Sequence, residues 1–250
     1  MNSSRLMKYF EQYVKNYDMN NINVKVKYFH SLKMMELCRD IATSLNVFNE
    51  EEIVICELIG LFHDIGAFDS VNNYHIIEEN DDYSMKSINI LFDKGLLRKI
   101  TNNTKYDSLI KMLIYCHNKT GIPEQFDDKL QNFCKVIQDA HKIDTFRIVI
   151  NYPYLDTKID KYPSALIYNQ FKNYKQINSK ISDNNADNIL IVISNLFGLW
   201  YKYSFQFINN NSYTKKIFNS LYYTENEYES FFKQLDKVID IYIRNKLSNK

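Results

Sequence analysis

"GLFHDIGAFD", residues 60–69, ends an apolar stretch with a histidine and an aspartate side by side. The apolar residues before the pair recur at helical spacing, which places His63 and Asp64 at the end of a helix that packs against a core. Burying an ionised carboxylate without a partner costs on the order of several kcal/mol. The pair is therefore either a polar helix end that stays in water or part of a metal site.

The same helical spacing continues through nearly the whole chain, and no period-two alternation lasts long enough to indicate a strand. With 5 glycines and 3 prolines in 250 residues, few positions interrupt long helices. We therefore predict an all-α protein, with a helical metal-binding domain over residues 1–150 and a helical extension over residues 151–250 packed on it as one structural unit. The predicted helices cover residues 4–17, 24–45, 50–64, 82–96, 105–117, 127–149, 163–174, 187–208, 212–222 and 225–247.

Charge and hydropathy exclude several classes of function. The 31 basic and 30 acidic residues give a net charge of +1, without the basic excess that nucleic acids or anionic membranes require. The longest apolar run, residues 189–200, is shorter than the about 20 residues that span a bilayer. The amino terminus lacks the apolar segment of a signal peptide. We expect a cytoplasmic protein that binds neither nucleic acid nor membrane.

Helix geometry gives the His63-Asp64 pair a partner in His30. His30 lies about 16 residues before the predicted turn at residues 46–49, and His63 about 13 residues after it, which are axial distances of about 24 and 20 Å. If the two helices form an antiparallel hairpin, the three side chains meet at nearly the same level. Two imidazoles and a carboxylate then face one another.

Two further histidines extend this set. His141 lies on a long predicted helix, and Asp144, three residues on, shares its face as an outer partner of the site. His117 ends another predicted helix, but nothing in the sequence forces it to the same level. Imidazole and carboxylate ligands suit Mn, Fe, Co, Ni and Zn. We predict a divalent metal ion, with Mg also in the range considered, bound by His30, His63, Asp64 and His141.

Five segments together resemble the HD superfamily of metal-dependent phosphohydrolases, in a bacterial branch of HD-domain proteins. They are "NVKVKYFHSLKMMELCRDIA" (23–42), "LIGLFHDIGAFDS" (58–70), "DDYSMKSINILF" (81–92), "YCHNKTGIP" (115–123) and "QDAHKIDTFRIV" (138–149). The resemblance extends towards the carboxy terminus through residues 194–208. It implies an HD-domain helical bundle in which His30, His63 and Asp64 match metal ligands of the family, and His117 is retained.

Three positions depart from the family pattern. His141 stands where the family has a late aspartate ligand, Tyr83 stands where members with two metals have a histidine, and Ala67 replaces an arginine. A neutral phenol is a poor ligand at pH 7, so we expect at most one tightly bound metal. In "NNYHIIEEND", His75 is either a surface residue or a substitute second-metal ligand together with Glu78 or Glu79.

The resemblance implies a hydrolase acting on a nucleotide or another small phosphate ester. A divalent metal polarises a phosphoryl oxygen and acidifies water, and Asp64 and His117 are the candidate catalytic residues. Lys119, Lys142 and Arg147 are candidates for phosphate contacts. The alternative is an HD domain without turnover that binds a metal or nucleotide as a regulator or scaffold. The sequence names neither the substrate nor the oligomeric state, for which a homodimer is one option.

Overall fold

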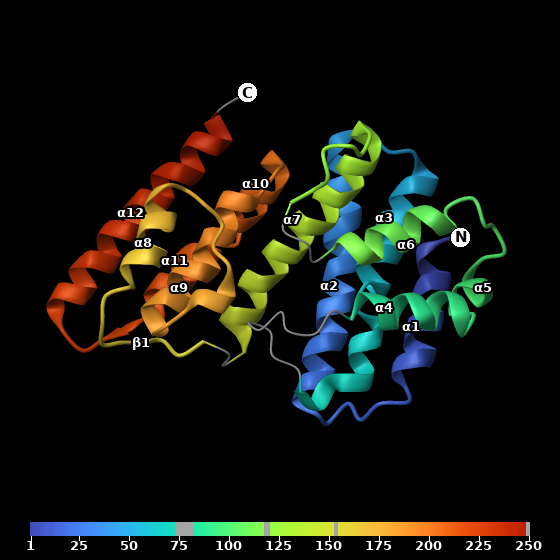
Figure 1. Cartoon of the computed structure of the whole chain (residues 1–250), viewed down its shortest axis with the longest axis horizontal. Helices are drawn as coiled ribbons and strands as arrows, with labels where there is room; N and C mark the ends of the chain where they lie inside the picture. Colours follow the sequence, from blue (N-terminus) through green and yellow to red (C-terminus); the bar gives the residue numbers. More distant parts are fainter. Residues whose placement is uncertain (74–82, 118–120, 153–154, 249–250) are drawn as a thin grey trace. The chain divides into compact units, whose positions relative to one another are not determined.

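The computed structural model describes residues 1–73, 83–117, 121–152 and 155–248, and the described chain is almost entirely helical (Figure 1). The all-α fold class is thus confirmed. The α-helices are α1 (Ser3–Val14), α2 (Ile22–Leu45), α3 (Glu50–Phe62), α4 (Ser84–Ile88), α5 (Leu96–Ile100), α6 (Asp107–Cys116), α7 (Asp128–Asn151), α8 (Ala165–Lys172), α9 (Asn185–Ser194), α10 (Lys202–Asn210), α11 (Tyr213–Asn219) and α12 (Asn226–Ser248).

Shorter elements connect these helices. Three are short 3₁₀ helices, η1 (Ile65–Asn73), η3 (Ser179–Ile181) and η4 (Asn195–Gly198), and one is a short π-helix, η2 (Asn89–Asp93). Two two-residue strands, β1 (Lys158–Ile159) and β2 (Tyr222–Tyr223), pair in parallel. No helix in the described ranges is both long and apolar enough to cross a bilayer.

Two compact units divide within α7, between His141 and Lys142, slightly before the boundary predicted at residue 150. The first unit holds α1 to α6 and the part of α7 up to His141, and the second holds the rest of α7 and the elements from β1 to α12. The packing of residues 151–250 on the first unit stays a prediction.

In the first unit, α2 and α3 form the helical hairpin that the sequence predicts. A left-handed Asn46 ends α2, because its φ of 55° is incompatible with a further helical turn. Asn49 begins α3 through a capping box, in which its side chain accepts from the Glu52 backbone N–H at 3.0 Å and the Glu52 carboxylate accepts from the Asn49 N–H at 2.9 Å. Three glutamates in the first turn also suit the helix dipole.

Two predicted helices are shorter than expected. The prediction of one helix over residues 82–96 is wrong, because α4 passes into the wide turn η2 and Gly95, with a φ of 74°, separates it from α5. The prediction over residues 187–208 is wrong as well, because η4 and the extended Leu199 interrupt the chain between α9 and α10. The Gln176 side chain packs against Gly198, where a Cβ atom would fit only if that side chain moved.

Candidate metal centre

The α2–α3 hairpin brings His30 and His63 together. Their Nε2 atoms lie 3.2 Å apart, and the His30 and His63 side chains are almost completely buried. The two helices touch backbone to backbone at Gly60, where a Cβ atom would lie 2.6 Å from the carbonyl oxygen of Met34. Gly60 precedes His63 by about one turn and Met34 follows His30 by about one turn. The antiparallel contact therefore places the two imidazoles at the same level, as the helix arithmetic predicts.

Backbone carbonyls fix the orientation of two of the imidazoles. His63 Nδ1 lies 3.0 Å from the carbonyl oxygen of Gly60, and His117 Nδ1 lies 2.6 Å from that of Ile114. Because a carbonyl oxygen only accepts, each Nδ1 carries a proton and donates it. The Nε2 atom of His63 is then the nitrogen that faces His30. In metal-binding histidines, one ring nitrogen usually donates a hydrogen bond to a carbonyl or carboxylate, which orients the other nitrogen toward the metal.

Asp64 has partners on both carboxylate oxygens. Oδ2 accepts from the Lys27 ammonium at 2.7 Å and lies 3.5 Å from His63 Nε2, and Oδ1 lies 3.2 Å from His117 Nε2. Burial alone would raise the pKa of Asp64, but Lys27, His63 and His117 outweigh it and hold the pKa well below its ordinary value. Asp64 is therefore an ionised carboxylate at neutral pH, although only 7% of it is exposed.

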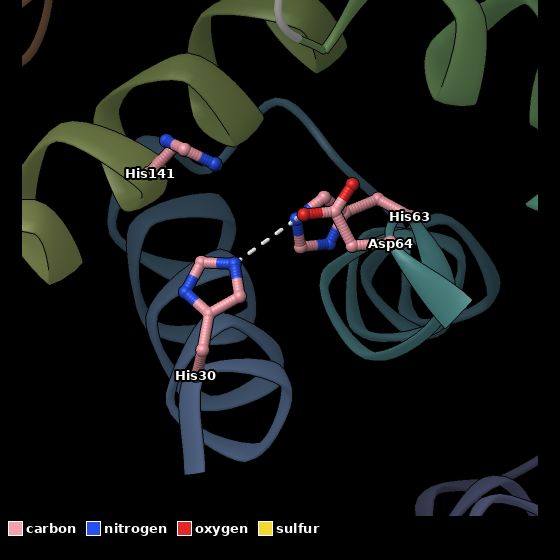
Figure 2. A group of neighbouring side chains, drawn as sticks. All are labelled: His30, His63, Asp64 and His141. Carbon is pink, nitrogen blue, oxygen red and sulfur yellow. Dashed lines mark hydrogen bonds and ion pairs between the residues drawn. The ribbon is translucent and has the colours of Figure 1, made fainter. Parts of the chain in front are cut away.

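His141 completes the cluster from α7. Figure 2 shows His30, His63, Asp64 and His141 pointing toward one another from α2, the end of α3 and α7. One ligand atom from each of these residues lies within 4.8 Å of those of the others. Exclusion of water lowers the pKa of His63, and the same effect together with the neighbouring imidazoles holds that of His141 well below its ordinary value. Both rings are neutral at pH 7 and present lone pairs.

This donor set fits a divalent metal ion. Ligand atoms about 2.1 Å from one ion lie about 3.0 Å apart in an octahedral site and about 3.4 Å apart in a tetrahedral one. The His30 to His63 separation of 3.2 Å and the His63 to Asp64 separation of 3.5 Å match these values. Three imidazoles and one carboxylate suit first-row transition metals better than Mg. The four residues that the sequence predicts as ligands are thus the ones that converge.

His117 also reaches the cluster, which the sequence did not require. It follows α6 directly, is 6% exposed, and lies with its ring centre 4.8 Å from that of His63. Its Nε2 faces Asp64, so it contacts the carboxylate of the predicted metal site. The catalytic role predicted for His117 stays a prediction.

The other predicted site residues lie elsewhere or have other partners. Asp144 is fully buried and binds Arg147 through both oxygens, at 2.5 Å to Nε and 3.0 Å to Nη2. The Arg147 guanidinium, which the sequence predicts to contact phosphate, is therefore already bound to a carboxylate. Lys142 is buried in the second unit, where its Cε lies close to Gly198. Lys119, His75, Glu78 and Glu79 lie outside the described residues.

The two remaining departures from the family pattern are buried. Ala67 is inaccessible to solvent and lies in η1, and Tyr83 is 8% exposed directly before α4. The Lys86 ammonium lies 5.4 Å from the centre of the Tyr83 ring. Both positions hold side chains that pack in the interior, and neither offers an imidazole or a guanidinium there.

Lys27 is the residue that the sequence reasoning missed. Its side chain is 1% exposed and its ammonium binds the central carboxylate of the cluster. A signal was present in "NVKVKYFH", because Lys27 precedes His30 by three residues and so shares its face of the helix. A lysine on the buried face of a helix requires an acidic partner, which here is Asp64.

Comparison with known families agrees with this geometry. Residues 28–146 match the family model described as HD domain, a range that includes His30, His63, Asp64, His117 and His141. No curated protein and no solved structure matches the chain.

Proposed function

Because residues 28–146 make this chain a member of the HD domain family, a superfamily of metal-dependent phosphohydrolases, we propose that it hydrolyses a small phosphate ester at the His30, His63, Asp64 and His141 cluster. The observation that carries the proposal is the convergence of three imidazoles on one ionised carboxylate. A bound divalent ion would polarise a phosphoryl oxygen and acidify water.

We propose that Asp64 and His117 handle the protons of the reaction. His117 donates from Nδ1 to the carbonyl of Ile114, and its Nε2 faces the ionised Asp64 at 3.2 Å. We propose that His117 takes part in proton transfer to the leaving oxygen, while Asp64 orients the attacking water.

A phosphate group is the substrate feature that the charges favour. Lys27 and a divalent ion together would outweigh the single negative charge of Asp64. A net positive, water-excluding site attracts phosphate oxygens. We propose a nucleotide as the class of small molecule to test first. Lys142 and Arg147 remain weaker candidates for phosphate contacts, since Arg147 is already bound to Asp144.

The direct test compares the wild type with Asp64→Asn. Purified protein is loaded separately with Mn, Fe, Co, Ni, Zn and Mg, and phosphate release is followed on nucleoside monophosphates, cyclic dinucleotides and a chromogenic phosphodiester. Removing an outer partner of a metal ligand costs about 10- to 100-fold in affinity or activity, so loss of the carboxylate itself should exceed this. Asp160→Asn, a change at an exposed carboxylate that pairs only weakly with Lys158 at 3.6 Å, is the matched control. Absence of bound metal from the wild type would refute the proposal.

A second candidate function is binding without turnover, as a regulator or scaffold. Two observations favour this second function. Arg147 is bound to Asp144, and position 67 holds an alanine, so fewer cations are available to bind a phosphate. The same panel separates the two functions. Metal bound in the wild type, a nucleotide that raises the melting temperature, and no phosphate release from any substrate would favour the second.

A further inference from the structure

The last helix, α12, carries two apolar stripes, and the fold of the second unit uses one of them. α12 packs against α10 and α11. The buried stripe is formed by Phe232, Leu235, Ile239 and Ile243. A second stripe faces solvent, where Val238 is 40% and Ile241 58% exposed and Phe231 is half-buried.

The exposed stripe has the spacing of a helix-pairing face. From Phe231 it runs through Gln234, Val238 and Ile241 to Asn245, in alternating steps of three and four residues. These steps keep the side chains on one side of a helix, and they recur where two helices pair along their length. Within the described chain no other helix covers this face, so α12 presents it to a partner.

The charges at the two ends of α12 indicate which partner fits. Glu225 and Glu227 lie at the start of the helix, and Arg244 and Lys246 lie near its end. The ion pairs of α12 within the described residues use none of these four side chains. A partner of one charge sign would be attracted at one end and repelled at the other. A second copy of this chain, turned end for end, meets opposite charge at both ends.

We propose that the chain forms a homodimer in which α12 of one copy pairs antiparallel with α12 of the other. The exposed stripe from Phe231 to Ile241 is centred on residue 236, with Glu227 nine positions before that residue and Arg244 eight positions after it. A two-fold axis at this level places Glu227 opposite Arg244 of the second copy and Phe231 opposite Ile241. The proposal does not depend on a metal at the Asp64 cluster.

A groove beside the first turns of α12 gives the second copy a place to insert a side chain. The groove measures about 390 Å³, opens to solvent, and is lined by residues that include Tyr162, Glu227, Phe231 and Gln234. The Tyr162 ring is 48% exposed and lies 5.3 Å from the Phe231 ring, centre to centre. In the antiparallel arrangement, Arg244 of the second copy reaches this groove, where its guanidinium would stack on Tyr162 and bind the Glu227 carboxylate.

The size of the face predicts a dimer of moderate strength. With 23 residues, α12 is about 35 Å long. Specific interfaces bury about 1,200–2,000 Å², and one helix pair with its groove lies near the lower end of that range. The net charge of +1 adds little repulsion between copies. We therefore expect a dissociation constant in the micromolar range.

Sedimentation velocity on the full-length protein over a range of concentrations tests the proposal. We expect a reversible equilibrium between monomer and dimer in the wild type. Ile241→Lys removes an apolar contact twice in each dimer and should weaken association by about 100-fold or more. Ile22→Lys, at an isoleucine of the first unit that is 54% exposed, is the matched control and should behave as the wild type.

Charge reversal tests the antiparallel arrangement. Glu227→Lys and Arg244→Glu should each weaken the dimer by about tenfold, because each places like charges opposite one another. The double variant restores opposite charges and should recover the wild-type affinity to within about threefold. Both changes oppose the dipole of α12, so damage to the fold would add up in the double variant. Recovery can therefore come only from a contact between the two positions.

Three outcomes would overturn the proposal. A wild type that stays monomeric at about 1 mM would leave the face to a partner of other chemistry. A dimer that is as strong in Ile241→Lys as in the wild type would use another surface. A double variant that associates more weakly than both single variants, with a circular dichroism spectrum like that of the wild type, would contradict the antiparallel pairing.

Discussion

Asp64 and Asp187 are both carboxylates withdrawn from water, and they differ in what surrounds them. Asp187, which is fully buried near the start of α9, accepts from the backbone N–H of Ser164 at 2.7 Å and of Asp183 at 3.0 Å. Asp64 is surrounded by side chains that bind protons or metals, namely Lys27, His63 and His117. One carboxylate ties a loop to a helix, and the other belongs to a chemical site.

The comparison shows that burial of a carboxylate does not by itself mark a functional site. Backbone N–H groups keep their protons at all ordinary pH values, so their hydrogen bonds to the Asp187 carboxylate do not change with conditions. Imidazole nitrogens can bind a metal ion, so the surroundings of Asp64 offer ligands that the backbone amides around Asp187 do not. The kind of partner, more than the depth of burial, separates structure from chemistry in this chain.

The largest effect on stability should follow from Asp187→Ala. The change leaves two backbone N–H groups without their acceptor, which we expect to lower the free energy of unfolding by about 2–4 kcal/mol. Urea denaturation followed by circular dichroism measures it. Co²⁺ stoichiometry should stay at the wild-type value, and a loss of metal binding in this variant would break the distinction between the two carboxylates.

Metal loading should stabilise the protein only through the Asp64 cluster. At a free metal concentration about 100 times the dissociation constant, the free energy of unfolding should rise by about 2.7 kcal/mol. Thermal unfolding with and without chelator measures the increment. It should vanish in Asp64→Asn and persist in full in Asp187→Ala, so an equal increment in both variants would contradict the assignment.

Gly60→Ala should act on both stability and the site. The added Cβ would meet the backbone of Met34 and Met35 at 2.6–2.8 Å, and such overpacking costs about 1–3 kcal/mol. The separation of α2 and α3 should also carry His30 away from His63 and weaken Co²⁺ binding. Glu50→Ala, at an exposed position of α3, should change stability by no more than about 0.5 kcal/mol. Unchanged Co²⁺ affinity in Gly60→Ala would show that the helix contact does not set the ligand spacing.

Acid should weaken the metal-free protein through its imidazoles. The pKa values of His63 and His141 are lower in the folded than in the unfolded protein. Their contribution to the free energy of unfolding is therefore fully present above the unfolded pKa of about 6.5 and is lost as the pH falls below that pKa. One pH unit below the unfolded pKa, each ring should lower the free energy of unfolding by about 1 kcal/mol. Urea unfolding of chelated protein at pH 7.5 and 5.5 measures the change, and His63→Gln should show a smaller pH dependence. Stability that rises on acidification would contradict the neutral assignment.

The sequence predicts the fold class and the central part of the site well, because both depend on local periodicity. His30 and His63 are related by two regular helices and a short turn, so counting residues is enough to bring them together. Asn49 likewise caps α3 through residues next to it in the chain. His141 joins them from a distant helix, and its place followed from the family resemblance more than from spacing.

The features that the sequence analysis does not predict have different causes. The break between α9 and α10 contains Gly198, against which the side chain of Gln176 packs from elsewhere in the sequence. Asp144 shares a helix face with His141, as predicted, but Arg147 on the same helix competes for it. Lys27 was overlooked because lysine is usually a surface residue, and only the fold brings it to Asp64.

The ion pair of Lys27 and Asp64 also bears on whether folding would depend on a bound metal. A small zinc domain whose ligands are charged and unpaired stays unfolded until the ion arrives. In this chain the ammonium already balances the carboxylate, and a hydrogen bond links His30 to His63. We therefore expect the chain to fold before any ion binds, so that the proposed metal could come and go without unfolding the protein.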